Sequence, residues 1–215
     1  MSWSSGKDSA WAFHRVVADG RVAVVGLLTT FNQEFDRVSI QGVRRELVEA
    51  QADRLGVPLR TVDLPWPCPN DVYEARMGEA MGVAFEEGIT GVVFGDLFLE
   101  DVRAYRVGKL SGTGIDPIFP IWGSKTRDLA LQMIEAGVRA VLTAVDTTQL
   151  PADFAGRQFD LTLLEDLPDG VDPLGENGEF HTFCYDGPMF DREIECQPGE
   201  IVDRGRFVYA DVVPG

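Results

Sequence analysis

Short apolar runs alternate with amphipathic stretches over the first two-thirds of the chain, and this alternation constrains the fold more than any other feature. Residues 22–29 (VAVVGLLT) and 91–95 (GVVFG) have the length and continuous hydrophobicity of strands that are buried on both faces of a parallel sheet. Residues 43–55 and 70–87 carry apolar side chains at helical spacing. The pattern predicts an open α/β sheet covered by helices, in which ligands bind beyond the carboxyl ends of the strands.

The same alternation predicts further elements, after which the composition changes. Additional strands are expected at residues 59–64, 115–121 and 138–145, and additional helices over the residues that end at Leu110 and over 126–136. In the last third, segments rich in Pro, Asp and Gly lead to alternating stretches at 180–185 and 206–213, which are typical of antiparallel strands. We therefore expect two domains, residues 1–121 and 122–215, of which the second is a smaller α+β domain.

The charge balance narrows the choice of partners. The chain has 19 Lys and Arg residues against 35 Asp and Glu residues, which gives a formal net charge of −16. Such a surface repels phosphate backbones and anionic headgroups, which disfavours nucleic-acid and membrane binding, whereas a single nucleotide needs only a local pocket of N–H groups and cations. No apolar run approaches the roughly 20 residues of a membrane span, and the N-terminus lacks the apolar stretch of a signal peptide. With three scattered cysteines and two histidines, these features predict a cytoplasmic protein without a disulfide framework or structural zinc, and they leave homo-oligomerisation open.

The first group of candidate functional residues is a loop of small residues directly before a predicted helix. It comprises Ser4, Ser5, Gly6, Lys7, Asp8 and Ser9. Small residues let backbone N–H groups approach an anion, the helix N-terminus adds positive potential, and Lys7 adds a full charge. The G-x-x-x-x-G-K-[ST] spacing of kinase-type phosphate loops is absent. The alternative is an exposed N-terminal tail with an ordinary helix cap.

The second group follows the apolar run at residues 91–95. Asp96, Glu100 and Arg103 recur at i, i+4 and i+7, so we expect them to share one helix face near the ligand edge of the sheet, with Asp96 as a helix cap. The carboxylates are suited to Mg²⁺, and the guanidinium is suited to a phosphate or a substrate carboxylate. The alternative is a helix cap with ordinary surface ion pairs.

The third group lies in the last third of the chain, at GENGEFHT (175–182). Its two glycines permit a tight turn that presents Glu176 and Asn177, and the following strand is expected to display Glu179 and His181 on one face. Two carboxylates and a histidine that lie close together are suited to acid–base chemistry or to metal binding. The alternative is a hairpin turn with exposed acids. The other histidine, His14, lies within an apolar helix and is predicted to pack rather than to act in catalysis.

Taken together, these motifs resemble those of a known family. The residues concerned are SSGKDS (4–9), GDLFLEDVRAYR (95–106), PIFPIWG (117–123), Asp172-Pro173 and GENGEFHTF (175–183). They resemble the diphthine–ammonia ligase family of PP-loop ATP pyrophosphatases, and within it a bacterial branch of adenine-nucleotide-binding or hydrolysing proteins. The first motif is similar to the S-G-G-x-D-S phosphate loop, and the acidic G-E-x-G-E-[FY] motif is the specific element. The similarity extends from Ser4 to about Phe190.

The resemblance implies a fold, cofactors and a role for each matched residue. The fold is a Rossmann-like parallel sheet of the PP-loop (HUP) type with a smaller C-terminal α+β domain, and the cofactors are ATP and Mg²⁺. Nucleotide contacts are implied for Ser4, Ser5, Gly6, Lys7, Asp8, Ser9, Asp101, Asn177, Gly178 and Thr182. Catalytic roles are implied for Asp96, Glu100, Arg103, Glu176, Glu179 and His181, with Asp96 and Glu100 also expected to hold Mg²⁺.

Two departures from the family pattern concern the N-terminus. Ser5 replaces the first of the two usual glycines, which costs on the order of 1 kcal/mol if that position requires a positive φ. Only Met1 to Trp3 precede the loop, so either the first strand is very short or the true start lies upstream.

The expected function is AMP-forming ligation. ATP activates a carboxylate acceptor, and ammonia or an amine then forms the amide. The sequence does not identify this acceptor, and modified protein side chains are among the candidates. Hydrolysis of the nucleotide by water and nucleotide binding without catalysis are the alternatives. The net charge of −16 and the lack of paired reactive cysteines disfavour a tRNA-thiolating enzyme.

Overall fold

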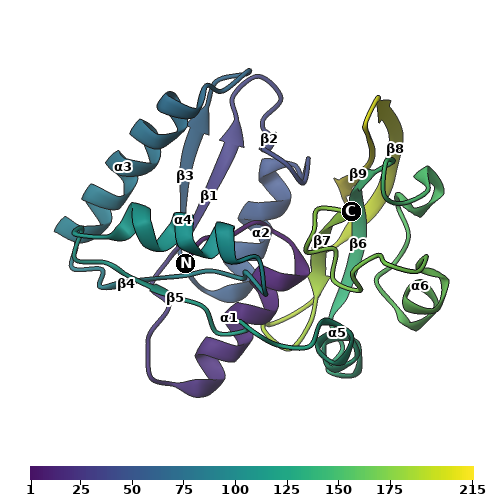
Figure 1. The fold of residues 1–215 in the computed structure, drawn as a ribbon, viewed down its shortest axis with the longest axis horizontal. Coiled ribbons are helices and arrows are strands. Elements are labelled where there is room, and N and C mark those ends of the chain that lie inside the picture. Colours follow the sequence, from purple (N-terminus) through teal and green to yellow (C-terminus); the bar gives the residue numbers. More distant parts are fainter.

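The computed structural model describes residues 1–215 and has a mixed α/β N-terminal part followed by an antiparallel sheet (Figure 1). The strands of the N-terminal part are β1 (Leu27–Asn32), β2 (Arg37–Val38), β3 (Leu59–Leu64), β4 (Gly91–Val93) and β5 (Asp116–Ile118). Its helices are α1 (Lys7–Asp19), α2 (Arg45–Leu55), α3 (Asn70–Glu86) and α4 (Glu100–Leu110). β1 pairs in parallel with β3 and antiparallel with β2, while β4 and β5 form a separate parallel pair.

The first three residues join these two sheets. Trp3 N donates to Leu28 O at 2.9 Å, and Leu28 N donates to Met1 O at 2.8 Å, so the N-terminus lies beside β1. On its other side, Ser2 N donates to Val93 O of β4 at 2.9 Å. Ser2 therefore forms a single-residue bridge to Leu28, which corresponds to the first of the two alternatives, a very short first strand.

The C-terminal part is built on a four-stranded antiparallel sheet in the order β7-β6-β9-β8. Its strands are β6 (Arg139–Asp146), β7 (Phe180–Asp186), β8 (Cys196–Arg204) and β9 (Phe207–Pro214), and its helices are α5 (Thr126–Glu135), α6 (Leu161–Asp166) and the 3₁₀ turn Ala152–Phe154. The alternating pattern grouped β6 with the parallel strands, but β6 pairs antiparallel with both neighbours. All of β6 after Arg139 is buried, and a continuous apolar run does not distinguish a parallel strand from the centre of a covered antiparallel sheet.

The strand predicted at residues 22–29 is displaced towards the C-terminus. β1 begins only at Leu27, and the side chains of Val22 and Val25 are 40% and 55% exposed. The register explains the shift, because Leu27 pairs with Leu59 at the start of β3 and no strand lies opposite the earlier residues. The prediction of a strand over residues 115–121 was also too long, since β5 covers three residues and Pro120 has no N–H to donate.

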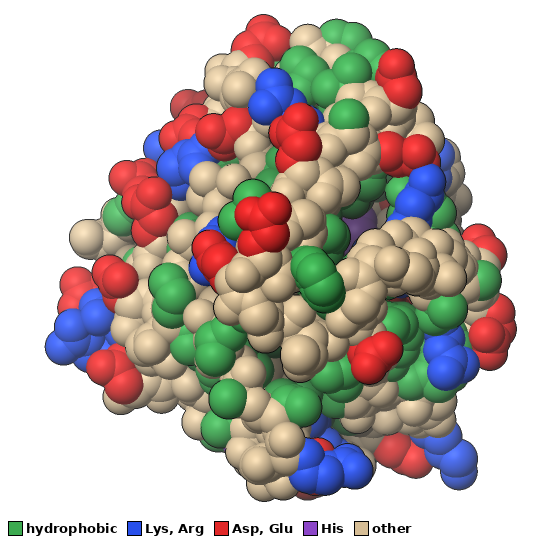
Figure 2. All heavy atoms as spheres, turned by 90° about the vertical axis from the view of Figure 1, so that its left-hand side faces the viewer, with side chains coloured by type: hydrophobic (Ala, Val, Ile, Leu, Met, Phe, Trp, Pro, Cys, Tyr) green, Lys and Arg blue, Asp and Glu red, His purple; other side chains and the backbone are tan.

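α3 lies at the left of Figure 1, where Met81 and Ala84 pack against a small cluster of buried residues, Val92, Phe94, Leu110 and Ile115. The sequence predicted this helix, but none of its residues is buried, and Phe85 is 54% exposed. The face shown in Figure 2, which is the left-hand side of Figure 1, carries scattered acidic and basic side chains with apolar ones between them. No helix of the protein is both long and apolar enough to cross a membrane.

One hydrophobic core runs through both parts of the molecule. Its 40 buried residues include Phe13 and Leu47 from the N-terminal helices and Leu142 and Phe183 from the C-terminal sheet. The strands of the antiparallel sheet all come from residues after 121, whereas the division into domains at 1–121 and 122–215 remains a prediction.

An ion pair of Asp211 also connects the two parts. From the N-terminal part, Arg37 donates to Asp211 at 2.6 and 3.2 Å, and Arg44 donates at 2.7 and 3.2 Å. Burial acts to raise the pKa of Asp211, but the hydrogen bonds from both guanidinium groups outweigh it and lower this pKa to about 2. The carboxylate therefore contributes stability above pH 4, and this contribution is lost as the pH falls through about 2.

We expect Asp211→Asn to lower the free energy of unfolding by about 2 kcal/mol at pH 7, measured by urea unfolding, because the charge-assisted bonds are lost. The difference from the wild type should shrink as the pH falls from 4 towards 2. Asp191→Asn is the matched control, since its side chain is 64% exposed and lies 4.0 Å from its only partner, Arg54. Equal stability of Asp211→Asn and the wild type at pH 7 would contradict the role of this ion pair.

Candidate active site

The loop of small residues forms the N-terminus of α1. Gly6 is the N-cap residue of this 13-residue helix, and no side chain caps its amides from that position. Ser4 Oγ donates to Ser9 Oγ at 3.1 Å, and Ser9 Oγ donates to Gly6 O at 2.8 Å. Ser5 is fully buried, so the alternative of an exposed tail is wrong. Of the first amides of α1, Lys7 N has a side-chain acceptor in Thr182 Oγ1. The N-terminus of a helix of this length is suited to an anion.

Ser5 adopts a φ of +69°, the left-handed region that the family glycine would occupy without strain. Its Oγ is buried and has no hydrogen-bond partner. We expect Ser5→Gly to raise the free energy of unfolding by about 1 kcal/mol, measured by urea unfolding, because the substitution relieves the backbone strain. Ser5→Ala is the control, since it removes the hydroxyl but keeps the strained Cβ. Lower stability of Ser5→Gly would show that the hydroxyl stabilises the loop more than the strain destabilises it.

Buried hydrogen bonds attach the loop to the C-terminal sheet. Cys184 N, on β7, donates to Ser5 O at 2.9 Å. Gln51 Nε2, on α2, donates to the carbonyl oxygens of Ser5 and Cys184 at 2.9 and 2.6 Å, and Trp3 Nε1 donates to Gln51 Oε1 at 2.8 Å. None of the sequence motifs includes Gln51, although a glutamine four residues after Leu47 on an apolar helix face is a usable signal.

Lys7 points into the protein. Its side chain is 1% exposed, and its Nζ donates to Leu174 O at 2.6 Å and to Asp8 Oδ2 at 3.0 Å. Its backbone N donates to Thr182 Oγ1 at 3.1 Å. The sequence predicted a cation at the phosphate loop, and the structure places this charge beneath the loop, against the C-terminal part.

Asp8 lies in the first turn of α1, against the end of β4. Burial raises the pKa of Asp8, and the ammonium of Lys7 opposes this shift. Asp8 Oδ1 is buried without a hydrogen-bond partner. A Cβ at Gly95 would lie 3.0 Å from the carbonyl carbon and oxygen of Asp8, so a larger residue there would press on the backbone of α1 where the chain after β4 approaches it.

The second group of predicted residues does not form one helix face. α4 begins at Glu100 with Leu99 as its N-cap, so Asp96 neither caps this helix nor belongs to it. Both oxygens of Asp96 accept hydrogen bonds from Arg106, at 2.6 and 3.2 Å, a partner that the i, i+4 spacing did not indicate. The reason for the error is that the chain between β4 and α4 is extended rather than helical at Leu99.

The other members of this group point elsewhere. Glu100 and Asp101 are exposed in the first turn of α4. The Arg103 guanidinium lies over the rings of Phe119 and Trp122, at 5.4 and 4.7 Å from their centroids. No group of three or more His, Cys, Asp or Glu side chains is arranged to hold a metal ion anywhere in the protein.

The GENGEFHT segment forms the predicted turn. Gly175 and Gly178 have positive φ angles of 72° and 82°. Glu176 Oε1 accepts a hydrogen bond from Leu97 N at 2.7 Å, which ties the turn to the residues after β4. Burial raises the pKa of Glu176 to about 7, and the charges of Asp8 and Asp96 add to the rise.

The acids of this turn are not exposed, so the alternative of a solvated hairpin is wrong. Glu179 is 2% exposed, and its Oε1 accepts hydrogen bonds from Asp172 N and Asn177 Nδ2, both at 2.9 Å. Glu179 Oε2 is buried without a partner. Glu179 precedes β7 by one residue, so the predicted strand does not include it. Burial, and then the charge of Lys7, lower the pKa of His181 to about 4, so this imidazole is neutral at pH 7.

The three segments therefore meet at one place. Lys7 contacts Leu174 and Thr182, and Glu176 contacts Leu97, so residues far apart in the sequence share one buried network. Within it lie three polar atoms without partners: Ser5 Oγ, Asp8 Oδ1 and Glu179 Oε2. A buried polar group without a partner costs about 1–3 kcal/mol. Three such atoms close together are typical of a site that binds a polar ligand.

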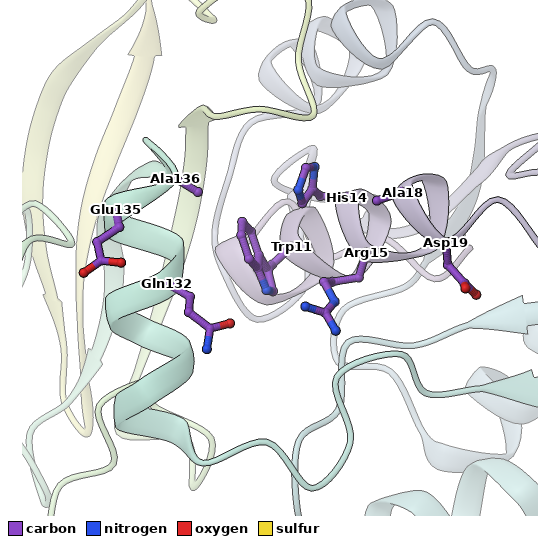
Figure 3. Close-up of a pocket in the computed structure, with 8 residues that line it drawn as sticks. All are labelled: Trp11, His14, Arg15, Ala18, Asp19, Gln132, Glu135 and Ala136. Carbon is purple, nitrogen blue, oxygen red and sulfur yellow. The ribbon is translucent and has the colours of Figure 1, made fainter.

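Two hollows in the protein surface lie away from this network. A groove of about 650 Å³ separates α1 from α5 and is lined in part by His14, Arg15 and Gln132 (Figure 3). In Figure 3, Trp11 and Gln132 extend towards each other from the two helices, while Glu135 points away. The His14 ring lies 4.9 Å from that of Trp11, which agrees with the predicted packing role. A second hollow of about 590 Å³ lies beneath α3.

Comparison with known proteins finds relatives over almost the whole chain. A family model described as the diphthamide synthase C-terminal domain matches residues 125–212. The diphthine–ammonia ligases of Bos taurus and Homo sapiens are 28% and 27% identical to this chain, and each alignment covers 97% of this chain and 86% of the relative. The diphthine–ammonia ligase of Danio rerio is 28% identical, over 97% of this chain and 90% of the relative. These matches confirm the resemblance to the diphthine–ammonia ligase family that the motifs indicate.

Proposed function

We propose that this protein is an ATP-dependent ligase that forms AMP and pyrophosphate while it converts a carboxylate acceptor into an amide with ammonia. The observation that carries the proposal is the contact between the two parts of the molecule: the acidic turn of the C-terminal part bonds through Glu176 to the residues after β4, beside the N-terminus of α1. A nucleotide site and an acid–base group are thus brought together. The similarity to these relatives and their names support this activity.

The proposal extends to the topology of the N-terminal sheet. We infer a Rossmann-like sheet of the PP-loop type in the order β3-β1-(residues 1–3)-β4-β5, with the division into domains at residues 121 and 122. The hydrogen bonds of Ser2 and Trp3 to β4 and β1 support this order, and Phe94 N donates to Ile118 O at 2.9 Å beyond β4. The loop then lies at the carboxyl end of the central strand, where ligands of such sheets bind.

The residues of the loop suit a triphosphate. We assign the phosphate contacts to the backbone amides at the start of α1 and to the hydroxyl groups of Ser4 and Ser9. Asp8 Oδ1, buried and without a partner, is a suitable ligand for a cation that accompanies the phosphates. Mg²⁺ usually combines one or two carboxylates with substrate phosphates, and it would neutralise charge on the leaving pyrophosphate. The predicted Mg²⁺ ligand Asp96 is held by Arg106, so Asp8 fits this role better.

The turn supplies the acid–base chemistry. When ammonia attacks an activated carboxyl group, the new amide nitrogen must lose a proton. Glu176 is suited to accept it, because a base is most effective when its pKa lies near the working pH, and burial raises the pKa of Glu176 to about 7. Neutral His181 and buried Glu179 complete the polar wall of the turn.

Product analysis tests this function. ATP labelled in the α-phosphate is incubated with the protein and Mg²⁺, with and without ammonium and a panel of carboxylates that includes diphthine, the residue named in the relatives. We expect AMP and pyrophosphate in amounts that depend on the acceptor. AMP formation that needs only water would identify a hydrolase, and binding without turnover would identify a regulatory protein. ADP and orthophosphate would contradict the proposal.

A further inference from the structure

We propose that Lys7 is a positioning residue that couples the nucleotide loop to the Gly175–Glu179 turn, and that it is not a direct ligand of the phosphates. The roles of the loop and the turn rest on the proposed function, whereas the contacts of Lys7 that join them are independent of any reaction. Lys7 is the first residue of α1, and both its backbone N and its Nζ donate hydrogen bonds to the C-terminal part, to Thr182 Oγ1 and Leu174 O.

The surroundings hold the ammonium on the inner side of the loop. Nζ lies 5.3 and 5.2 Å from the ring centroids of Phe159 and Phe180. A buried ammonium requires compensation by hydrogen bonds or by aromatic faces, and here a carbonyl, a carboxylate and two rings supply it. To reach a phosphate at the loop, Nζ would have to leave all of these partners and expose the carbonyl of Leu174 without a donor.

A short series of hydrogen bonds connects Lys7 to the proposed base. Leu174, which accepts from Lys7, donates through its own N to Asp172 Oδ1 at 2.9 Å. Asp172 Oδ1 also accepts from Glu176 N at 3.3 Å, and Glu176 Oε1 accepts from Leu97 N. A small displacement of α1 when phosphates bind would therefore change the position of the Glu176 carboxylate. This coupling gives a physical reason for a fully buried lysine at the start of α1.

The variant Lys7→Met tests the proposal, because it keeps the length of the side chain and removes the ammonium. We expect amide hydrogen exchange over residues 175–179 to accelerate by about tenfold or more, since the turn loses its anchor. The rate of AMP formation should fall by about 30-fold, while the Kd for ATP stays within about threefold of the wild type. Lys125→Met is the matched control, since Lys125 is exposed and bonds to neither part of the network.

Hydrogen exchange and the pKa of His181 can both be measured without turnover, so they separate this inference from the proposed function. In Lys7→Met the pKa of His181, followed by NMR, should rise from about 4, because the charge of Lys7 is one of the causes that lower it. Unchanged exchange of residues 175–179 together with a loss of ATP affinity of about 30-fold or more would overturn the proposal and make Lys7 a phosphate ligand.

The wild-type protein provides a test if Lys7→Met does not fold. Acetic anhydride labels accessible lysine side chains, and mass spectrometry locates the label. We expect Lys109 and Lys125 to react, and Lys7 to remain unlabelled both with and without ATP, because Nζ is enclosed in either state. Labelling of Lys7 that ATP prevents would overturn the proposal, since it would show an ammonium that the nucleotide covers.

Discussion

The variant Glu176→Gln is expected to form AMP about 10²-fold more slowly than the wild-type protein, while its affinity for ATP stays within a few-fold of wild type. Glutamine keeps a carbonyl oxygen at the position of Oε1, which can still accept the hydrogen bond from Leu97 N at 2.7 Å. The substitution therefore removes the base and leaves the turn in place. Single-turnover measurement of AMP, with ATP binding measured by calorimetry, separates the two effects. Glu165→Gln, at an exposed position, is the control.

The pH dependence makes this prediction sharper. The pKa of Glu176 is raised to about 7, so the carboxyl group is largely protonated at pH 6 and largely ionised at pH 8. The rate in the wild type should rise through pH 7 to a plateau, and this rise should be absent in Glu176→Gln. Since the unfolded state releases this proton near pH 4.5, Glu176 also makes the wild type less stable as the pH rises through 7, and the variant should lose that trend. If Glu176→Gln abolishes ATP binding, the turn belongs to the nucleotide site.

Local chemistry explains the part of the site that could be predicted from the sequence. The end of α2 follows from Gly56, which adopts a φ of +68°, and the GENGEFHT turn follows from Gly175 and Gly178. The strain at Ser5 could be anticipated because a serine stands where a glycine is usual. In each case the backbone preference of one residue determines the local structure, so the local sequence is sufficient to predict it.

The remainder depends on contacts between distant segments. The direction of Lys7 is set by Leu174 and Thr182, about 170 positions away in the chain, and no local pattern contains that information. The spacing of Asp96 and Glu100 suggested a shared helix face, but Arg106 and the extended backbone before α4 decide the outcome. The strand β8 was not predicted, because its residues are exposed or only partly buried and show no apolar alternation. Secondary structure was thus more predictable than the pairing of side chains.

Asp8→Asn is expected to abolish the stabilisation of the protein by ATP and Mg²⁺ while leaving the protein folded without nucleotide. Asp8 Oδ2 bonds to Lys7 Nζ, whereas Asp8 Oδ1 is buried without a partner, so Oδ1 remains available to a second cation. A ligand present at 100 times its Kd adds about 2.7 kcal/mol to the free energy of unfolding, which is the effect that the variant should lose.

Thermal unfolding with and without ATP, in Mg²⁺ or in EDTA, measures this stabilisation directly. In the wild type, EDTA should remove most of the shift in Tm, because the Asp8 carboxylate then faces the triphosphate without a cation between them. Asp8→Asn should show the same small shift in both buffers, and Asp169→Asn, at an exposed position, should behave as the wild type. A full Mg²⁺-dependent shift in Asp8→Asn would exclude Asp8 as the carboxylate that meets the cation and would return Asp96 to that role, since release of Arg106 would free both of its oxygens.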